Sequence, residues 1–73
     1  MYKIKEGIKL EELEFYNFYF IGNSYMRDTA MSGMFNINVE TRIITRLHPY
    51  SMREEPTLRE IQMLGIADLV EKV

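Results

Sequence analysis

Residues 35–47, FNINVETRIITRL, contain the clearest strand pattern in the chain. Apolar side chains recur at every second residue in the first half of this stretch, at Phe35, Ile37 and Val39, and the second half continues the period at Ile43 and Leu47 with Thr45 between. A period of two is typical of a β-strand with one buried face. The two runs meet at the polar pair Glu40-Thr41, so the sequence predicts an antiparallel hairpin whose inner face helps to form the core.

The length and composition predict a single small domain spanning residues 1–73. A chain of this size buries only about 60% of its unfolded surface, so its stability margin is narrow. No cysteine is present, which excludes stabilisation by a disulfide or a cysteine-based zinc site. Five tyrosines, four phenylalanines and six methionines exceed what so small a core holds, so some of them are expected on the surface or against a partner.

The net charge of −2 counts against nucleic-acid binding, because such proteins use a basic excess to neutralise phosphates. No apolar run approaches the roughly 18–20 residues that span a bilayer, and the first residues lack the apolar region of a secretion signal. The absence of cysteine agrees with a reducing compartment. We therefore expect a cytoplasmic protein with no membrane association.

A short helix is predicted over residues 10–16. Its apolar residues Leu10, Leu13 and Tyr16 lie three apart and share one face. Lys9 is a poor N-cap, so the first residue of this helix stays open. Asn17 follows the last apolar position and readily takes the left-handed conformation of a helix C-cap. A helix this short is expected to dock on the sheet, because it is not stable alone.

Three strands are predicted, over residues 24–29, 34–39 and 42–47. The turn between the second and third is expected to be longer than two residues, because Glu40-Thr41 lacks the Asn-Gly signature and Asn38 tolerates the left-handed region. Residues 18–21 form either a fourth strand or an extended connector, and residues 2–6 could add an edge strand. Residues 31–33 are predicted to turn, and residues 48–56 to form a loop, because they contain two prolines.

A second helix is predicted after Thr57, because Thr57 and Glu60 have the spacing of a capping box. It is expected to run to about Leu64, with Gly65 as a kink or a cap. Residues 69–73 stay open between helix and strand. The predicted fold is therefore α+β: a short N-terminal helix, a three-stranded antiparallel meander and a C-terminal helix on the same face. The predicted core comprises Ile8, Leu10, Leu13, Phe15 or Tyr16, Phe18, Phe35, Ile37, Ile43, Leu58, Ile61, Leu64, Leu69 and Val70.

No motif in the sequence predicts catalysis, a cofactor or a metal site. His48 is the one histidine and has no accompanying nucleophile or ligand set, so an ordinary loop histidine is expected. Glu54 and Glu55 are adjacent and follow Arg53, which is typical of solvated loop carboxylates. The glycine-containing segments lack the Lys-Ser/Thr of a phosphate loop. We therefore expect a protein that is not an enzyme.

Surplus aromatic, methionine and arginine side chains predict a binding surface. Arg42 and Arg46 lie four apart on one predicted strand, and Arg27 is expected to join them across the sheet in a row. Ile43 and Ile44 must point to opposite faces, so one of them lies beside this row. The candidate interface residues are Tyr19, Tyr25, Arg27, Arg42, Ile44 and Arg46. Two functions follow: a self-associating protein-interaction protein, such as a homodimer, or a nucleic-acid-binding or transcription-regulating module that uses the arginine row.

Several short stretches resemble small uncharacterised proteins of bacteriophages and prophages from Gram-positive bacteria. They are KIKEG at residues 3–7, LEELE at 10–14 with Tyr16-Asn17-Phe18, GNSY at 22–25, ETRII at 40–44 and DLVEKV at 68–73. The resemblance implies a helix, a three-stranded meander and a helix, and it implies no catalytic residues. It also implies an accessory or host-modulating protein that acts by binding, and the partners that we expect are a second copy of the chain and another protein.

Overall fold

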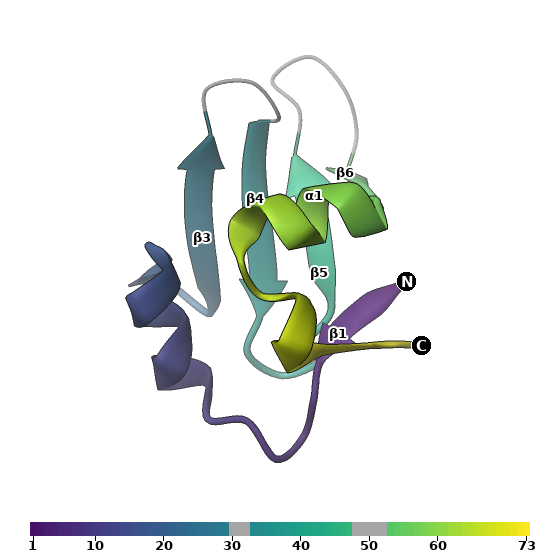
Figure 1. Ribbon diagram of the computed structural model, residues 1–73. Coiled ribbons are helices and arrows are strands. Elements are labelled where there is room, and N and C mark those ends of the chain that lie inside the picture. The colour runs from purple at the N-terminus through teal and green to yellow at the C-terminus, as the bar shows by residue number, and fades with distance from the viewer. Residues whose placement is uncertain (30–32, 48–52) are drawn as a thin grey trace.

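A computed structural model describes residues 1–29, 33–47 and 53–73, and Figure 1 shows how their elements are arranged. Along the chain lie β1 (Tyr2–Ile4), the 3₁₀ helix η1 (Leu10–Tyr16), β2 (Tyr19–Ile21), β3 (Ser24–Thr29), β4 (Gly33–Asn38), β5 (Ile44–Leu47), β6 (Arg53–Glu54), α1 (Leu58–Leu64), the 3₁₀ turn η2 (Ala67–Leu69) and β7 (Val70–Lys72). Strands β2 to β6 form one antiparallel sheet in chain order, and β1 pairs with β7 in a second sheet. The predicted turn residues 31 and 32 and His48 lie outside the described residues.

The predicted α+β arrangement of one helix, a three-stranded meander and another helix is wrong, because the domain is mostly sheet. Strand β2 extends the meander, since Gly22-Asn23 turns the chain back onto β3 and places Ile21 opposite Ser24. Gly22 has φ +63°, which suits the first central position of a two-residue hairpin turn. Strand β6 lies inside the segment predicted as a loop, where it pairs with β5.

The pairing of β1 with β7 joins the two ends of the chain. Tyr2 lies opposite Lys72, and the amide of Val73 donates to the carbonyl of Met1 at 2.8 Å. The N-terminal ammonium also forms an ion pair with Glu55. The end of the chain, which the sequence leaves open between helix and strand, therefore forms a strand over residues 70–72. One 3₁₀ turn precedes this strand.

The helix predicted over residues 10–16 has those bounds and is a 3₁₀ helix. Its apolar residues recur strictly every third position, and this spacing aligns them on one side of a helix with three residues per turn. Asn17 ends the helix in the left-handed conformation with φ 67°, as predicted. The amide of Asn17 donates to Glu14 and that of Phe18 to Leu13, which is the Schellman pattern.

The central hairpin has a longer turn than the pair Glu40-Thr41, as predicted. Asn38 closes it, because its Oδ1 accepts from the amides of Glu40 at 2.8 Å and Thr41 at 3.0 Å. The left-handed residue is Arg42, with φ 65°, and not Asn38. As a result, Ile37 pairs with Ile44, and Ile44, rather than the predicted Ile43, points into the core.

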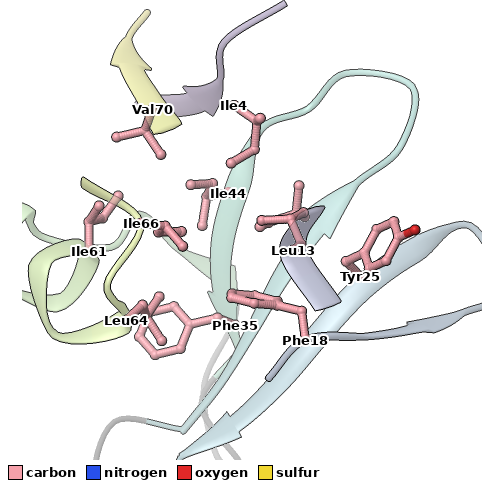
Figure 2. Close-up of a cluster of buried hydrophobic side chains, with 11 residues drawn as sticks. Ile4, Leu13, Phe18, Tyr25, Phe35, Ile44, Ile61, Leu64, Ile66 and Val70 are labelled. Carbon is pink, nitrogen blue, oxygen red and sulfur yellow. The ribbon is translucent and has the colours of Figure 1, made fainter. Parts of the chain in front are cut away.

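Figure 2 shows buried side chains from both helices and both sheets lying around Phe35 and Ile44. The cluster contains Ile4, Leu13, Phe18, Tyr25, Phe35, Ile37, Ile44, Ile61, Leu64, Ile66 and Val70. Seven of these belong to the predicted core: Leu13, Phe18, Phe35, Ile37, Ile61, Leu64 and Val70. Ile8, Leu10, Tyr16 and Leu69 are partly buried against the cluster. Of the alternatives Phe15 and Tyr16, Phe15 is exposed, and Leu58 is exposed as well, so its assignment to the core is wrong.

Helix α1 begins as the capping box predicts. The Thr57 hydroxyl accepts from the amide of Glu60 at 3.2 Å, and the Glu60 carboxylate accepts from the amide of Thr57 at 2.9 Å. The helix ends at Gly65, whose φ of +83° is left-handed. The chain then turns back, which places Ile66 in the core and leads into β7.

Candidate interaction surface

The five-stranded sheet has one face against the core and another that the core does not cover. In β4, Phe35 and Ile37 are fully buried beneath η1 and α1, and Figure 1 shows α1 in front of β4 and β5. Because side chains alternate along a strand, the residues between them point the other way. The register extends this second set across β2 to β5. We call it the outer face: Tyr19, Ile21, Ser24, Met26, Asp28, Met34, Asn36, Asn38, Thr45 and Leu47.

The outer face mixes apolar side chains with uncharged polar ones, of which Ser24 and Asn36 are buried, although no described helix covers it. Tyr19, Ile21 and Leu47 are exposed, and Met26 and Met34 are half-buried. Among its positions in β2–β5, Asp28 carries the one charge, although 27% of the whole chain is charged. An antiparallel sheet with a solvated face usually places polar residues there. The outer face therefore has the composition of an interface centre, in which charges are depleted and tyrosine and methionine are enriched.

Strand β2 connects the outer face to further exposed aromatic side chains. All three of its residues are exposed, with 44% of Tyr19, 57% of Phe20 and 55% of Ile21 accessible. The ring of Phe20 points to the core side and contacts that of Tyr25, with centroids 5.2 Å apart. Phe15, on η1 just before β2, is 86% exposed. Exposed large apolar side chains, as these are, occur often at binding sites.

The predicted interface residues occupy different places. Tyr19 lies on the outer face and is exposed. Tyr25 is buried on the core side, and burial raises the pKa of its hydroxyl above 10.0, with smaller contributions from Glu14 and Glu11. Ile44 is fully buried beneath α1 and β1.

The predicted arginine row is not formed. Arg27 points to the core side, where its Nη1 donates to the carbonyls of Tyr16 and Leu64, each at 3.1 Å. It therefore joins the end of η1 to the end of α1. Arg42 lies in the turn before β5, not in a strand, and its Nη1 donates to the carbonyls of Lys5 at 2.7 Å and Ile8 at 2.8 Å.

Arg46 is bound by two carboxylates of the same chain. Its guanidinium pairs with Glu54 on β6 and, at 2.7 Å, with Glu60 on α1. The hydrogen bond with Glu54 raises the pKa of Arg46 above its ordinary value. Burial alone would raise the pKa of Glu60, but its hydrogen bonds with Thr57 and the charge of Arg46 outweigh burial, so this pKa lies below 4.5. All three arginines of the predicted row thus hold the fold together.

Sequence reasoning missed Ile21, Met26 and Met34 as surface candidates. Each lies in a segment whose pattern shows alternation, but the pattern alone does not show which side the helices cover. The signal was the lack of charge at alternate positions within each strand, at 19 and 21, at 24 and 26, and at 34, 36 and 38, interrupted at Asp28. It becomes readable once the register aligns these positions across strands.

Within residues 1–29, 33–47 and 53–73, the His, Cys, Asp and Glu side chains form no group of three that could hold a metal ion. None of the helices in these ranges combines the length and apolar character needed to cross a bilayer. Comparisons with protein-family models, curated proteins and solved structures give no match to this chain.

Proposed function

We propose that this protein is a homotypic interaction module, which associates with a second copy of itself through the apolar surface formed by β2 and the outer face. The observation that carries this proposal is the nearly uncharged outer face, which presents Tyr19, Ile21, Met26, Met34 and Leu47. Burying apolar area stabilises an interface by about 25 cal/mol per Å² before the costs of association. A 73-residue chain also gains stability from association, because its own core is small.

The dimensions of the sheet indicate a weak rather than an obligate complex. Strands lie about 4.8 Å apart and rise about 3.3 Å per residue, so the outer face measures about 20 Å on each side. Interfaces of this extent are at the small end of specific protein–protein contacts. We therefore expect a dimer that forms at micromolar concentrations and separates on dilution.

The alternative function, nucleic-acid binding through an arginine row, has less support. The guanidinium groups of Arg27, Arg42 and Arg46 already bind carbonyls or carboxylates of the same chain. Neutralising phosphates would require these groups to leave their partners. An accessory role toward another protein, which the resemblance to phage proteins implies, stays a prediction that the same surface would serve.

Sedimentation equilibrium across low to high micromolar concentrations tests the proposal. The expected result is a concentration-dependent monomer–dimer equilibrium. Ile21→Lys should raise the dissociation constant at least about tenfold, because it places a charge on the apolar surface. Met63→Lys is the matched control, since Met63 is 52% exposed on α1 and Ile21 is 55% exposed on β2. A wild-type chain that remains monomeric throughout would overturn the proposal.

A further inference from the structure

Strand β2 is the unprotected edge of the five-stranded sheet. It forms one end of the strand order, and β6 forms the other. Strand β6 has two residues, both charged, and β1 carries Lys3. By contrast, residues 18–26, FYFIGNSYM, contain neither a charge nor a proline. Natural edge strands are often very short or carry lysine, proline or a bulge that prevents pairing with another chain; β2 is short, with three residues, but it has none of the other protections.

The backbone of Phe20 points toward this open edge. The amide of Val39 donates to the carbonyl of Asn23 at 3.0 Å, so Ser24 is a non-hydrogen-bonded position relative to β4 and directs its backbone toward β2. Its partner Ile21, and Tyr19 two residues before, therefore bond to β3. The intervening Phe20 directs its N–H and C=O away from β3.

The open edge is short and has a defined start. The amide of Phe18, the preceding outward position, already donates to Leu13 at 3.2 Å. The edge thus offers the N–H and C=O of Phe20, the next outward position at Gly22, and the carbonyl of Phe18. A Cβ at Gly22 would meet no atom within 4 Å, so the backbone there is open to an approaching strand.

We propose that a second copy of this chain pairs its β2 antiparallel with this β2 across a two-fold axis at Phe20. This rests on the proposed function and narrows its surface to β2: the two copies meet along that strand, and Met26, Met34 and Leu47 of the outer face stay uncovered in the dimer. On the axis, Phe20 and the partner's Phe20 exchange both N–H···O=C bonds. On each side, the amide of Gly22 in one copy donates to the carbonyl of Phe18 in the other. The two five-stranded sheets then become one continuous sheet.

A second copy fits this edge because the strand is complementary to itself. In the proposed register Tyr19 lies opposite the partner's Ile21, and aromatic and β-branched residues form favourable cross-strand pairs. No like charges face each other, since β2 carries no charge. The two outer faces become continuous in the paired sheet, so Tyr19 and Ile21 meet the partner at the centre of one larger apolar surface.

Amide hydrogen exchange, followed by NMR at several protein concentrations, tests the pairing directly. The hydrogen-exchange rates of the Phe20 and Gly22 amides should fall about tenfold once nine-tenths of the chains are dimeric, because these amides exchange only from the monomer. The amides of Tyr19 and Ile21 provide the internal reference, since they already bond to β3. If the dimer forms without slowing the Phe20 amide, the pairing is refuted while self-association stands.

Two variants separate edge pairing from packing of the outer faces. Phe20→Pro removes the outward N–H and leaves the ladder with β3 intact, so it should abolish the dimer. Met34→Lys introduces a charge in the middle of the outer face and should leave the dimer within about threefold of its wild-type affinity. The reverse result, in which Met34→Lys abolishes the dimer and Phe20→Pro does not, would refute edge pairing. Absence of a wild-type dimer in sedimentation would remove the proposed function as well.

Discussion

Replacing Arg42 by alanine should destabilise the fold without changing its core. Arg42 is partly buried, with 18% of its side chain accessible, and its Nη1 binds the carbonyls of Lys5 and Ile8 at 2.7 and 2.8 Å. The backbone carbonyl of Arg42 also accepts a hydrogen bond, at 3.0 Å, from the amide of Ile4, the last residue of β1. One side chain therefore attaches the segment after β1 to the turn before β5.

The expected loss is about 2–3 kcal/mol of unfolding free energy. A hydrogen bond to a charged group contributes about 1.5–3 kcal/mol, and partial exposure of these carbonyls places each bond at or below the lower end. The contact with Glu6 at 3.5 Å adds little, because 71% of the Glu6 side chain is accessible. Arg42→Gly loses the same bonds but relieves the left-handed backbone at φ 65°, which costs a non-glycine residue about 1 kcal/mol. It should therefore be about 1 kcal/mol more stable than Arg42→Ala.

Urea unfolding followed by far-UV circular dichroism measures these differences, at one protein concentration so that association contributes equally. Arg59→Ala is the control, because Arg59 is exposed on α1 and its loss should stay within about 0.5 kcal/mol of wild type. An Arg42→Ala variant as stable as this control would refute the role of Arg42 as a clamp. Equal stability of the alanine and glycine variants would refute the argument from backbone strain.

Three other positions test the polar contacts and the helix end. Glu60 has a lowered pKa, so its contribution to the free energy of unfolding is present above pH 4.5 and is lost as the pH falls through the lowered value. Glu60→Gln should reduce this loss of stability in acid, measured as the urea midpoint at several pH values. A variant with the same pH profile as the wild type would contradict this. The Oγ1 of Thr45 is buried and has no hydrogen-bond partner among the described residues. Thr45→Val should therefore leave the free energy of unfolding in urea unchanged or raise it by up to about 1 kcal/mol. A clearly lower free energy of unfolding would show that the hydroxyl is bound. Gly65→Ala should cost about 1–2 kcal/mol because Gly65 has φ +83°, whereas Gly7→Ala, in open space, should change the thermal midpoint little.

Interactions between residues close together in the sequence made several elements predictable. Thr57 and Glu60 cap α1 through bonds that span three residues, and Asn17 ends η1 by its own tolerance of the left-handed conformation. The strand predicted over residues 24–29 has the bounds of β3. These features depend on atoms a few residues apart, so the local sequence contains all the information that they require.

The errors share a different physical origin. Two adjacent isoleucines, Ile43 and Ile44, have equal apolar character, and the length of the turn at Asn38 decides which one faces the core. The helix predicted over residues 10–16 has the observed bounds, but its spacing suits both an α-helix and a 3₁₀ helix, so the local sequence leaves its type open. Local pattern leaves such alternatives nearly equal in energy.

The sequence by itself determined the small size of the domain, its caps and turns, the alternating strands around Phe35 and the excess of aromatic and methionine side chains. Only the tertiary structure decided that residues 2–4 pair with residues 70–72 and that β2 forms an edge. It also decided that the arginines bind the fold itself. These outcomes depend on groups far apart in the chain, whose contacts form only when the sheet and helices close on one core. The hairpin that begins at Phe35 is therefore predictable as an element, whereas the surface available for a second copy is a property of the whole fold.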